Sequence, residues 1–159
     1  MRKLGSRRRD RVKTKGIDHA LIVVKDMDQS VRFLSNFFDT KFEEVPWVRN
    51  RFGMRICIDA DRQIELMSLV DPAKAANLPM PFRKIAEFAE RGGEGPFMVC
   101  MGVEDAEKAV ADAERKGVRV ANILEEKQLL PSIPHFKEII LNEEDLPVKG
   151  FYFIAYPGD

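Results

Sequence analysis

Hydrophobic and polar residues alternate along short stretches typical of β-strands, and these are separated by stretches with helical spacing. The first strand-like stretch runs from residue 17 to 24, and there His19 shares one face with Ile17, Leu21 and Val23. A helix is predicted next, with Asp26 or Asp28 as its N-cap and an apolar side formed by Val31, Leu34 and Phe38. Strand-like stretches over 41–48, 52–60 and 62–70 complete a β-α-β-β-β unit.

The same order of elements recurs in the second half of the chain. A strand over 96–103 is followed by a helix over 105–117, which Gly117 ends, and by strands over 118–124, 136–144 and 150–156. The intervening segment is rich in Pro and Ala and carries one short amphipathic helix over 83–92. We therefore divide the chain into a tail (1–15), a first module (16–70), a linker (71–94) and a second module (95–159).

This duplication predicts an α+β fold in which two βαβββ modules form paired, curled mixed sheets around a cleft. One helix can cover only one face of each sheet, so the uncovered faces are left to line the cleft. His19 faces the cleft if the helix covers the side of Ala20, Ile22 and Val24. Glu65 shares a face with Met67, and Met98 shares one with Cys100.

The charge of the chain is unevenly distributed, although its formal net charge is zero. Residues 1–15 contain eight Lys or Arg and one Asp, a net charge of +7, so the rest of the chain carries −7. A basic arm can bind nucleic acid or anionic lipid, or it can be a solvated tail. The acidic body lacks interleaved basic and aromatic positions, which argues against nucleic acid as the main partner.

Composition places the chain among globular cytoplasmic proteins. It is 45% hydrophobic and 33% charged, and no stretch approaches the roughly 18 consecutive apolar residues of a membrane span. The N-terminus has no apolar segment behind its basic residues, unlike a secretory signal. Cys57 and Cys100 lie inside apolar strand-like runs, which is typical of buried thiols in a reducing compartment.

Several short motifs resemble the vicinal oxygen chelate superfamily, which includes glyoxalases, methylmalonyl-CoA epimerases, ring-cleaving dioxygenases and bleomycin- and fosfomycin-resistance proteins. The resemblance covers nearly all of residues 16–156, and the segment 84–118 is most similar to methylmalonyl-CoA epimerases. The matching residues are Asp18-His19 with Asp26 and Asp28, Phe33 and Phe38, Ile64-Glu65-Leu66, Ile85-Ala86-Glu87-Phe88, Gly93-Glu94-Gly95 and Gly117-Val118.

The resemblance implies a metal site of which only half is present. Metal-dependent members take ligands from the first and fourth strands of each module, and the first-module positions here are His19 and Glu65. Such ligands suit Zn, Mn, Fe, Co or Ni. In the second module Met98 stands where an epimerase-like sequence has a histidine, and Tyr152 or a neighbour stands opposite Glu65. We therefore expect the divalent metal to be weakly bound or absent.

Other candidate residues have both a functional and a purely structural interpretation. Met67, Met98, Cys100 and Tyr152 are expected to line the cleft, although Met98 and Cys100 are also soft ligands that suit copper. One of Glu43 and Glu44 is a general base if its strand turns it inward, and otherwise both are edge charges. The group Arg49, Arg51 and Arg55 could bind an anion, and His135 is the remaining histidine.

Two functions follow from these expectations. The first is an isomerase- or lyase-like enzyme acting on a small oxygenated substrate, with Glu65 and His19 as its catalytic residues. The alternative is a metal-free binding protein of the bleomycin-resistance type, which sequesters a small molecule in the cleft. A homodimer is expected in either case, because paired sheets leave edges to cover. The sequence leaves open whether the modules pair within one chain or between two.

Overall fold

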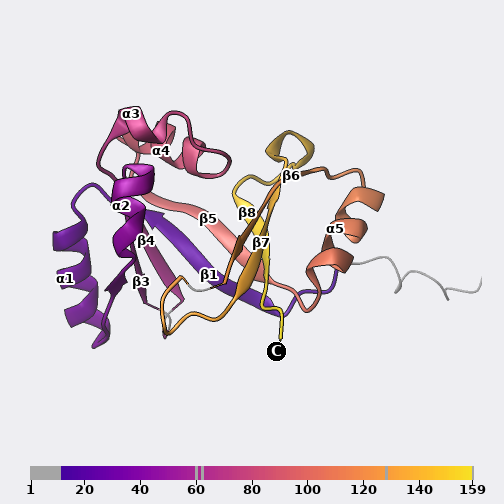
Figure 1. The fold of residues 1–159 in the computed structure, drawn as a ribbon, viewed down its shortest axis with the longest axis horizontal. Coiled ribbons are helices and arrows are strands. Elements are labelled where there is room, and N and C mark those ends of the chain that lie inside the picture. The colour runs from indigo at the N-terminus through magenta and orange to yellow at the C-terminus, as the bar shows by residue number, and fades with distance from the viewer. Residues whose placement is uncertain (1–11, 60, 62, 128, 159) are drawn as a thin grey trace, which may run out of the picture.

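Eight strands form one mixed sheet in the order β2-β3-β4-β1-β5-β8-β7-β6. A computed structural model describes residues 12–158 except 60, 62 and 128. Figure 1 shows β1 and β5 side by side in the middle, with one half of the molecule on each side of them. This arrangement confirms the predicted α+β fold of two βαβββ modules.

The first module consists of β1 (Gly16–Val23), α1 (Met27–Phe38), β2 (Glu43–Glu44), β3 (Met54–Asp59) and β4 (Ile64–Leu69). β4 runs parallel to β1 and antiparallel to β3. An additional helix, α2 (Pro46–Phe52), lies between β2 and β3.

The second module repeats this order with β5 (Gly95–Gly102), α5 (Ala106–Arg115), β6 (Val120–Glu126), β7 (Phe136–Leu141) and β8 (Phe151–Ala155). A 3-10 helix, η1 (Glu143–Asp145), precedes β8. The segment between the modules forms α4 (Phe82–Glu90), close to the expected helix, and also α3 (Pro72–Ala75), which the sequence pattern did not predict.

Equivalent aspartates begin the main helix of each module. Asp26 accepts a hydrogen bond from the backbone N–H of Gln29 (2.9 Å), and Asp105 accepts one from that of Lys108 (2.8 Å). Each aspartate thereby satisfies a backbone donor that the first turn of a helix leaves unpaired. Of the two expected caps for α1, the structure selects Asp26.

The expected strand over 41–48 is wrong in its second half. Only Glu43 and Glu44 pair with β3, and the chain enters α2 at Pro46. Proline fits the first turn of a helix because its missing N–H needs no partner there. Gly53 then ends α2 in a left-handed conformation with φ +66°. The expected strand over 136–144 likewise ends at Leu141, before η1.

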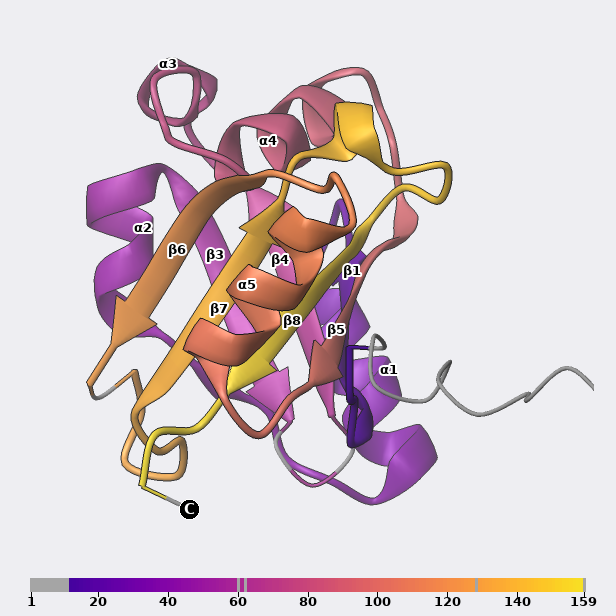
Figure 2. The same cartoon turned by 90° about the vertical axis from the view of Figure 1, so that its right-hand side faces the viewer.

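Each main helix packs against its own half of the sheet, α1 over a small separate core and α5 as part of the larger core. Met27, Val31 and Leu34 of α1 pack with Ile22, Val24, Cys57 and Leu66. In the second module, α5 lies in front of β7 and β8 in Figure 2 and contributes Ala106, Ala109 and Ala113 to the larger core. Leu21, Val23 and Met67 belong to that core, so His19 is on the face opposite α1, as alternation predicts.

The two modules join through antiparallel pairing of β1 with β5 within one chain. Irregular register occurs on β1 between Ile17 and His19 and between Leu21 and Ile22. Most of the basic tail lies outside the described residues. Among the residues that the structure describes, no helix is both long and apolar enough to cross a membrane.

Candidate functional site

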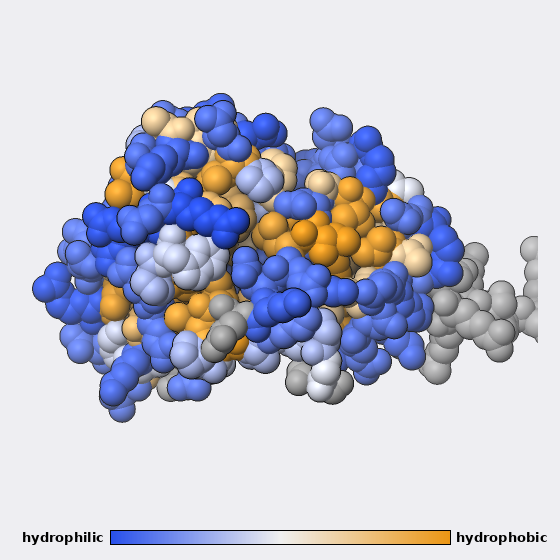
Figure 3. All heavy atoms as spheres, viewed as in Figure 1, coloured by the Kyte–Doolittle hydropathy of each residue, from blue (hydrophilic) through white to orange (hydrophobic). Residues whose placement is uncertain are grey.

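A cavity of about 310 Å³ lies between the two modules. Its lining comes from every strand except β2, together with α2, α4 and the loop before β7, and most of it is apolar. The large apolar side chains in it include Trp47, Phe52, Phe82, Leu124 and Phe136. Figure 3 shows a patch of apolar surface that extends from the middle of this view over the second half of the molecule, with polar residues around it.

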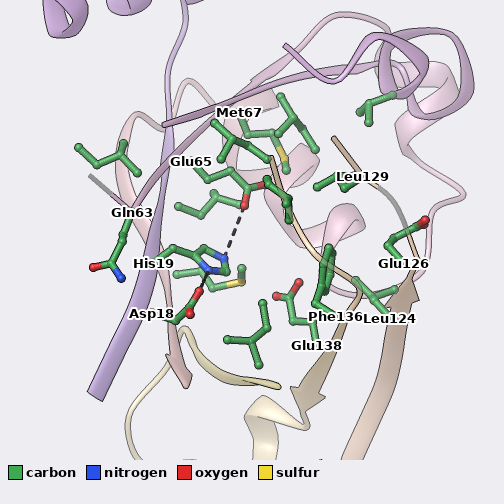
Figure 4. A pocket seen from close by; sticks show the side chains of 18 of the residues that line it. Asp18, His19, Gln63, Glu65, Met67, Leu124, Glu126, Leu129, Phe136 and Glu138 are labelled. Carbon is green, nitrogen blue, oxygen red and sulfur yellow. Dashed lines mark hydrogen bonds and ion pairs between the residues drawn. The ribbon is translucent and has the colours of Figure 1, made fainter. Parts of the chain in front are cut away.

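His19 projects from β1 into this cavity and is held by Asp18. The Nδ1 atom of His19 lies 2.8 Å from Asp18 Oδ1, and the Tyr156 hydroxyl donates to the same oxygen at 2.9 Å. Figure 4 shows the ring between Asp18 and Glu65. With Nδ1 bound to a carboxylate, the Nε2 atom is the one presented to the cavity.

Glu65 lies beside that free nitrogen. Its Oε2 is 3.5 Å from His19 Nε2, and both side chains are largely buried, with 18% and 15% exposed. The contact is an ion pair without hydrogen-bond geometry, and among the described residues Nε2 is a buried nitrogen with no hydrogen-bond partner. A buried nitrogen of this kind indicates a site that is completed by something else.

Glu138 on β7 is a site residue that the sequence analysis missed. Its side chain lines the cavity and is 8% exposed, and its Oε1 accepts from the Cys100 thiol at 3.3 Å. In Figure 4 it points toward His19 from the opposite wall. One signal was present, because Glu138 shares a strand face with Phe136 and Ile140, where a lone carboxylate is unusual.

Burial and nearby charges shift the pKa values of the whole group. Burial alone would lower the pKa of His19, but the hydrogen bond with Asp18 and the charges of Glu65 and Glu138 outweigh it and raise the pKa to about 9. Burial raises the pKa of Glu138 to about 7 and raises that of Glu65, although His19 opposes both shifts. Burial alone would raise the pKa of Asp18, but the hydrogen bonds with His19 and Tyr156 outweigh this effect. The pKa of Asp18 is therefore lowered. The group therefore combines an imidazolium and the ionised Asp18 with two carboxyl groups, Glu65 and Glu138, that protonate more easily than usual.

The residues expected to line the cleft divide into two pairs. Met67 and Met98 line the cavity. Cys100 lies behind the lining, fully buried between His19 and Glu138. Tyr152 is also fully buried, and its hydroxyl donates to Glu143 Oε1 at 3.0 Å.

The remaining candidates lie outside the lining of the cavity. Glu44 forms two 2.8 Å hydrogen bonds with Arg55, while Glu43 accepts from Ser132 at 3.2 Å. His135 contacts Glu125 at 2.7 Å on the surface. Arg51 stacks over Trp47 and Phe52, and Arg49 is exposed. These contacts support the edge-charge interpretation of Glu43 and Glu44.

His19, Cys100 and Glu138 form a cluster that could bind a divalent ion, whereas the sequence indicated only two ligands, His19 and Glu65. Donor atoms of His19, Cys100 and Glu138 all lie within 4.8 Å of one another. Imidazole, thiolate and carboxylate are common zinc ligands. A bound cation would also offset the raised pKa of the Cys100 thiol, which burial and the charge of Glu138 cause. The Nε2 atom of His19 has no hydrogen-bond partner among the described residues.

Comparison with solved structures supports the fold at low sequence identity. Methylmalonyl-CoA epimerase from Mycobacterium tuberculosis is 20% identical, with a TM-score of 0.63 over 89% of this chain and 87% of that one. A variant of the Streptomyces coelicolor epimerase in complex with 2-nitronate-propionyl-CoA is 18% identical, with a TM-score of 0.69 over 92% and 97%. A hypothetical protein from Bacillus halodurans is 19% identical, with a TM-score of 0.59 over 87% and 91%.

Sequence comparison gives the family. No curated protein sequence matches this chain. The model of the glyoxalase/bleomycin resistance protein/dioxygenase superfamily matches residues 18–128, which is more than half of the chain and includes His19, Glu65 and Cys100. The structural neighbours above have the same two-module architecture at low identity. The chain therefore belongs to the glyoxalase/bleomycin resistance protein/dioxygenase superfamily.

Proposed function

We propose that this protein is an isomerase- or lyase-type enzyme that moves a proton on a carbon next to an oxygenated group of a small, largely apolar substrate. The observation that carries this proposal is the Glu65 carboxylate, which lines an apolar cavity 3.5 Å from His19 Nε2. Such a pair places a proton acceptor and a positive group on the same side of a water-poor pocket.

Glu65 is the residue to which we assign proton transfer. Burial raises its pKa, with His19 opposing the shift, so its basicity is matched better to a carbon acid than that of a solvated carboxylate. It extends from β4 into the cavity beside Met67, whose side chain is fully buried. The apolar neighbour limits the access of water to the carboxylate.

We assign to His19 the role of binding and polarising the oxygen atom of the substrate. Asp18 and Tyr156 fix its ring, so that Nε2 faces the cavity and needs no reorganisation when substrate arrives. A divalent ion bound at His19 would polarise that oxygen and stabilise negative charge on it. Glu65 Oε2 lies 3.5 Å from His19 Nε2, so a substrate whose oxygen is bound at His19 would place its neighbouring carbon near this carboxylate.

The test is deuterium exchange at the acidic carbon. The protein is incubated in D₂O with 2-methyl-branched acyl thioesters, methylmalonyl-CoA among them because of the structural neighbours, and with 2-hydroxy ketones. We expect exchange by NMR with at least one class, and a reduction of about 100-fold or more in Glu65→Gln. Glu90→Gln, an exposed carboxylate on α4, is the matched control. Exchange that Glu65→Gln leaves unchanged would contradict the proposal.

A sequestering protein is the second candidate, favoured by the aromatic walls of the cavity. Trp47 lines the cavity and is the only tryptophan of the chain, so its fluorescence reports on ligand entry. Binding without exchange across the panel, at an affinity that is equal in wild type and Glu65→Gln, would favour sequestration. An enzyme instead predicts exchange that is sensitive to Glu65.

We also propose that the protein is a homodimer. Phe33 and Phe37 on α1 are 61% and 69% exposed, and their rings stack with centroids 5.5 Å apart. Exposed aromatic pairs are unusual on monomers and typical of interfaces. Phe37→Lys is expected to shift the sedimentation coefficient to that of a monomer, whereas a monomeric wild type would contradict the proposal.

The proposed compartment is the cytoplasm, because Cys57 and Cys100 are both buried free thiols. Intact protein from cytoplasmic expression is expected to show two titratable thiols after unfolding without reductant.

A further inference from the structure

The second module presents metal-ligating side chains at positions other than those that the family resemblance indicates. Glu65 on β4 pairs with the residue two beyond His19 on β1, and Tyr152 on β8 pairs with the residue two beyond Met98 on β5. Met98 and Tyr152 are thus the internal equivalents of His19 and Glu65. Neither is a good ligand for a hard or borderline divalent ion.

Cys100 and Glu138 instead supply donors from neighbouring positions. Cys100 lies two residues beyond Met98 on β5, directly opposite His19 in the β1–β5 register. Glu138 comes from β7, which pairs with β8. Both side chains are nearly or fully buried, and Cys100 Sγ lies 3.3 Å from Glu138 Oε1.

The distances suit a single zinc-like ion. The donor atoms of His19, Cys100 and Glu138 lie within 4.8 Å of one another. Donors around one tetrahedral zinc ion, at about 2.0–2.3 Å from it, lie roughly 3.5 Å apart. Only small side-chain movements separate this arrangement from coordination.

The environment of His19 provides an independent indication. Metal-bound imidazoles usually donate their other ring nitrogen to a carboxylate, which orients the ring. Asp18 takes this role at 2.8 Å and is itself held by Tyr156, and the opposite nitrogen, Nε2, is buried without a hydrogen-bond partner among the described residues. The ring is therefore oriented for a ligand that the protein alone does not provide.

We propose that His19, Cys100 and Glu138 bind one divalent ion of the zinc class, Zn²⁺ or Co²⁺, and leave its fourth position open toward the cavity. His19 and Glu138 line the cavity while Cys100 lies behind them, so the ion is accessible from one side. Three protein ligands and an open position are typical of catalytic zinc sites. The inference deepens the proposed function by naming the ligands, and it leaves Glu65 free as the proton acceptor.

The thiolate makes the ligand set directly observable. Metal-free full-length protein is titrated with Co²⁺, and we expect one ion per chain with a near-ultraviolet band from sulfur-to-cobalt charge transfer. Cys100→Ala should lose the band, whereas Cys57→Ala should keep it, because Cys57 packs beneath α1 in a separate cluster. Asp18→Asn, which keeps the three ligands but weakens the hydrogen bond that orients His19, should weaken binding about 10–100-fold.

X-ray absorption of the Zn²⁺-loaded wild type gives a second readout that needs no variant. One sulfur neighbour at about 2.3 Å is expected. No sulfur neighbour, a cobalt band that persists in Cys100→Ala, or no binding of either ion would each overturn the inference.

The result of the metal-binding experiments can be distinguished from the result of the deuterium-exchange test of the proposed function. A sulfur-bound ion without deuterium exchange would refute the function and keep the site. Exchange sensitive to Glu65 without a sulfur-bound ion would refute the site and keep the function.

Discussion

Asp18 and Asp145 are carboxylates whose pKa is lowered by a neighbouring donor, but only one of them belongs to the site. Asp18 orients His19 and cannot be changed without disturbing the cavity. Asp145 lies on η1, where its Oδ2 accepts from the backbone N–H and the side chain of Arg119, both at 2.9 Å. A substitution at Asp145 therefore measures what a carboxylate–arginine pair contributes to stability without affecting the site.

Asp145→Asn is expected to lower the thermal midpoint at neutral pH. The hydrogen bonds from Arg119 lower the pKa of Asp145 from 3.8 to about 2 in the folded state. A depressed pKa contributes stability that is fully present above 3.8 and is lost as the pH falls toward 2. The difference between wild type and Asp145→Asn should hence be constant near neutrality and shrink through this window, as followed by circular dichroism. A difference that grows on acidification would contradict it.

At the level of single residues, the family resemblance indicated His19 and Glu65 as site residues, and period-two alternation predicted that His19 lies on the uncovered face of its strand. It could not predict Tyr156 as a partner of Asp18, since 138 residues separate them and the contact depends on how the sheet curls. Glu138 was not predicted because it lies on β7, the third strand of its module, whereas the resemblance indicates ligands on the first and fourth strands. The isolated carboxylate between Phe136 and Ile140 was the available signal.

At the level of elements, α2 shows where sequence pattern failed. The stretch over 41–48 was predicted to be a strand, yet Pro46 opens a helix that carries Trp47 to the cavity. Gly53 ends this helix in a left-handed conformation, at a position that falls inside the expected strand over 52–60. Local alternation cannot reveal a turn that depends on packing against α3.

Gly53→Ala is expected to destabilise the protein strongly. Its φ of +66° is costly for alanine, and an added Cβ would lie 2.6 Å from the backbone oxygen of Asp71. We expect a loss of about 2–4 kcal/mol in the free energy of unfolding, measured in urea.

Gly117→Ala is the matched control for this substitution. It also has a positive φ, +80°, but an added Cβ would meet nothing within 4 Å, so its cost should stay near 1 kcal/mol. Equal effects of the two substitutions would show that the close approach of α2 to Asp71 is unimportant.

At the level of the whole molecule, the site lies where the two modules join. His19 on β1 and Cys100 on β5 face each other across the pairing that unites them, and Glu138 reaches in from β7. One chain thus contains all the proposed ligands, and a second copy is unnecessary for the site. The same junction concentrates Asp18, Glu65 and Glu138 around a single imidazole, which is unfavourable for a protein without a bound cation.

Glu138→Gln should therefore have opposite effects with and without metal. Without metal, the substitution removes a buried carboxyl group that like charges surround, and we expect a gain of about 1 kcal/mol in the free energy of unfolding. With excess Zn²⁺, wild type should gain stability in proportion to the logarithm of the zinc concentration, because the ion binds only the folded chain. Glu138→Gln should gain far less, and Glu114→Gln, an exposed carboxylate on α5, should behave as wild type in both conditions. If zinc stabilised Glu138→Gln as much as wild type, Glu138 would have no part in binding the ion, and its burial at the junction would need another cause.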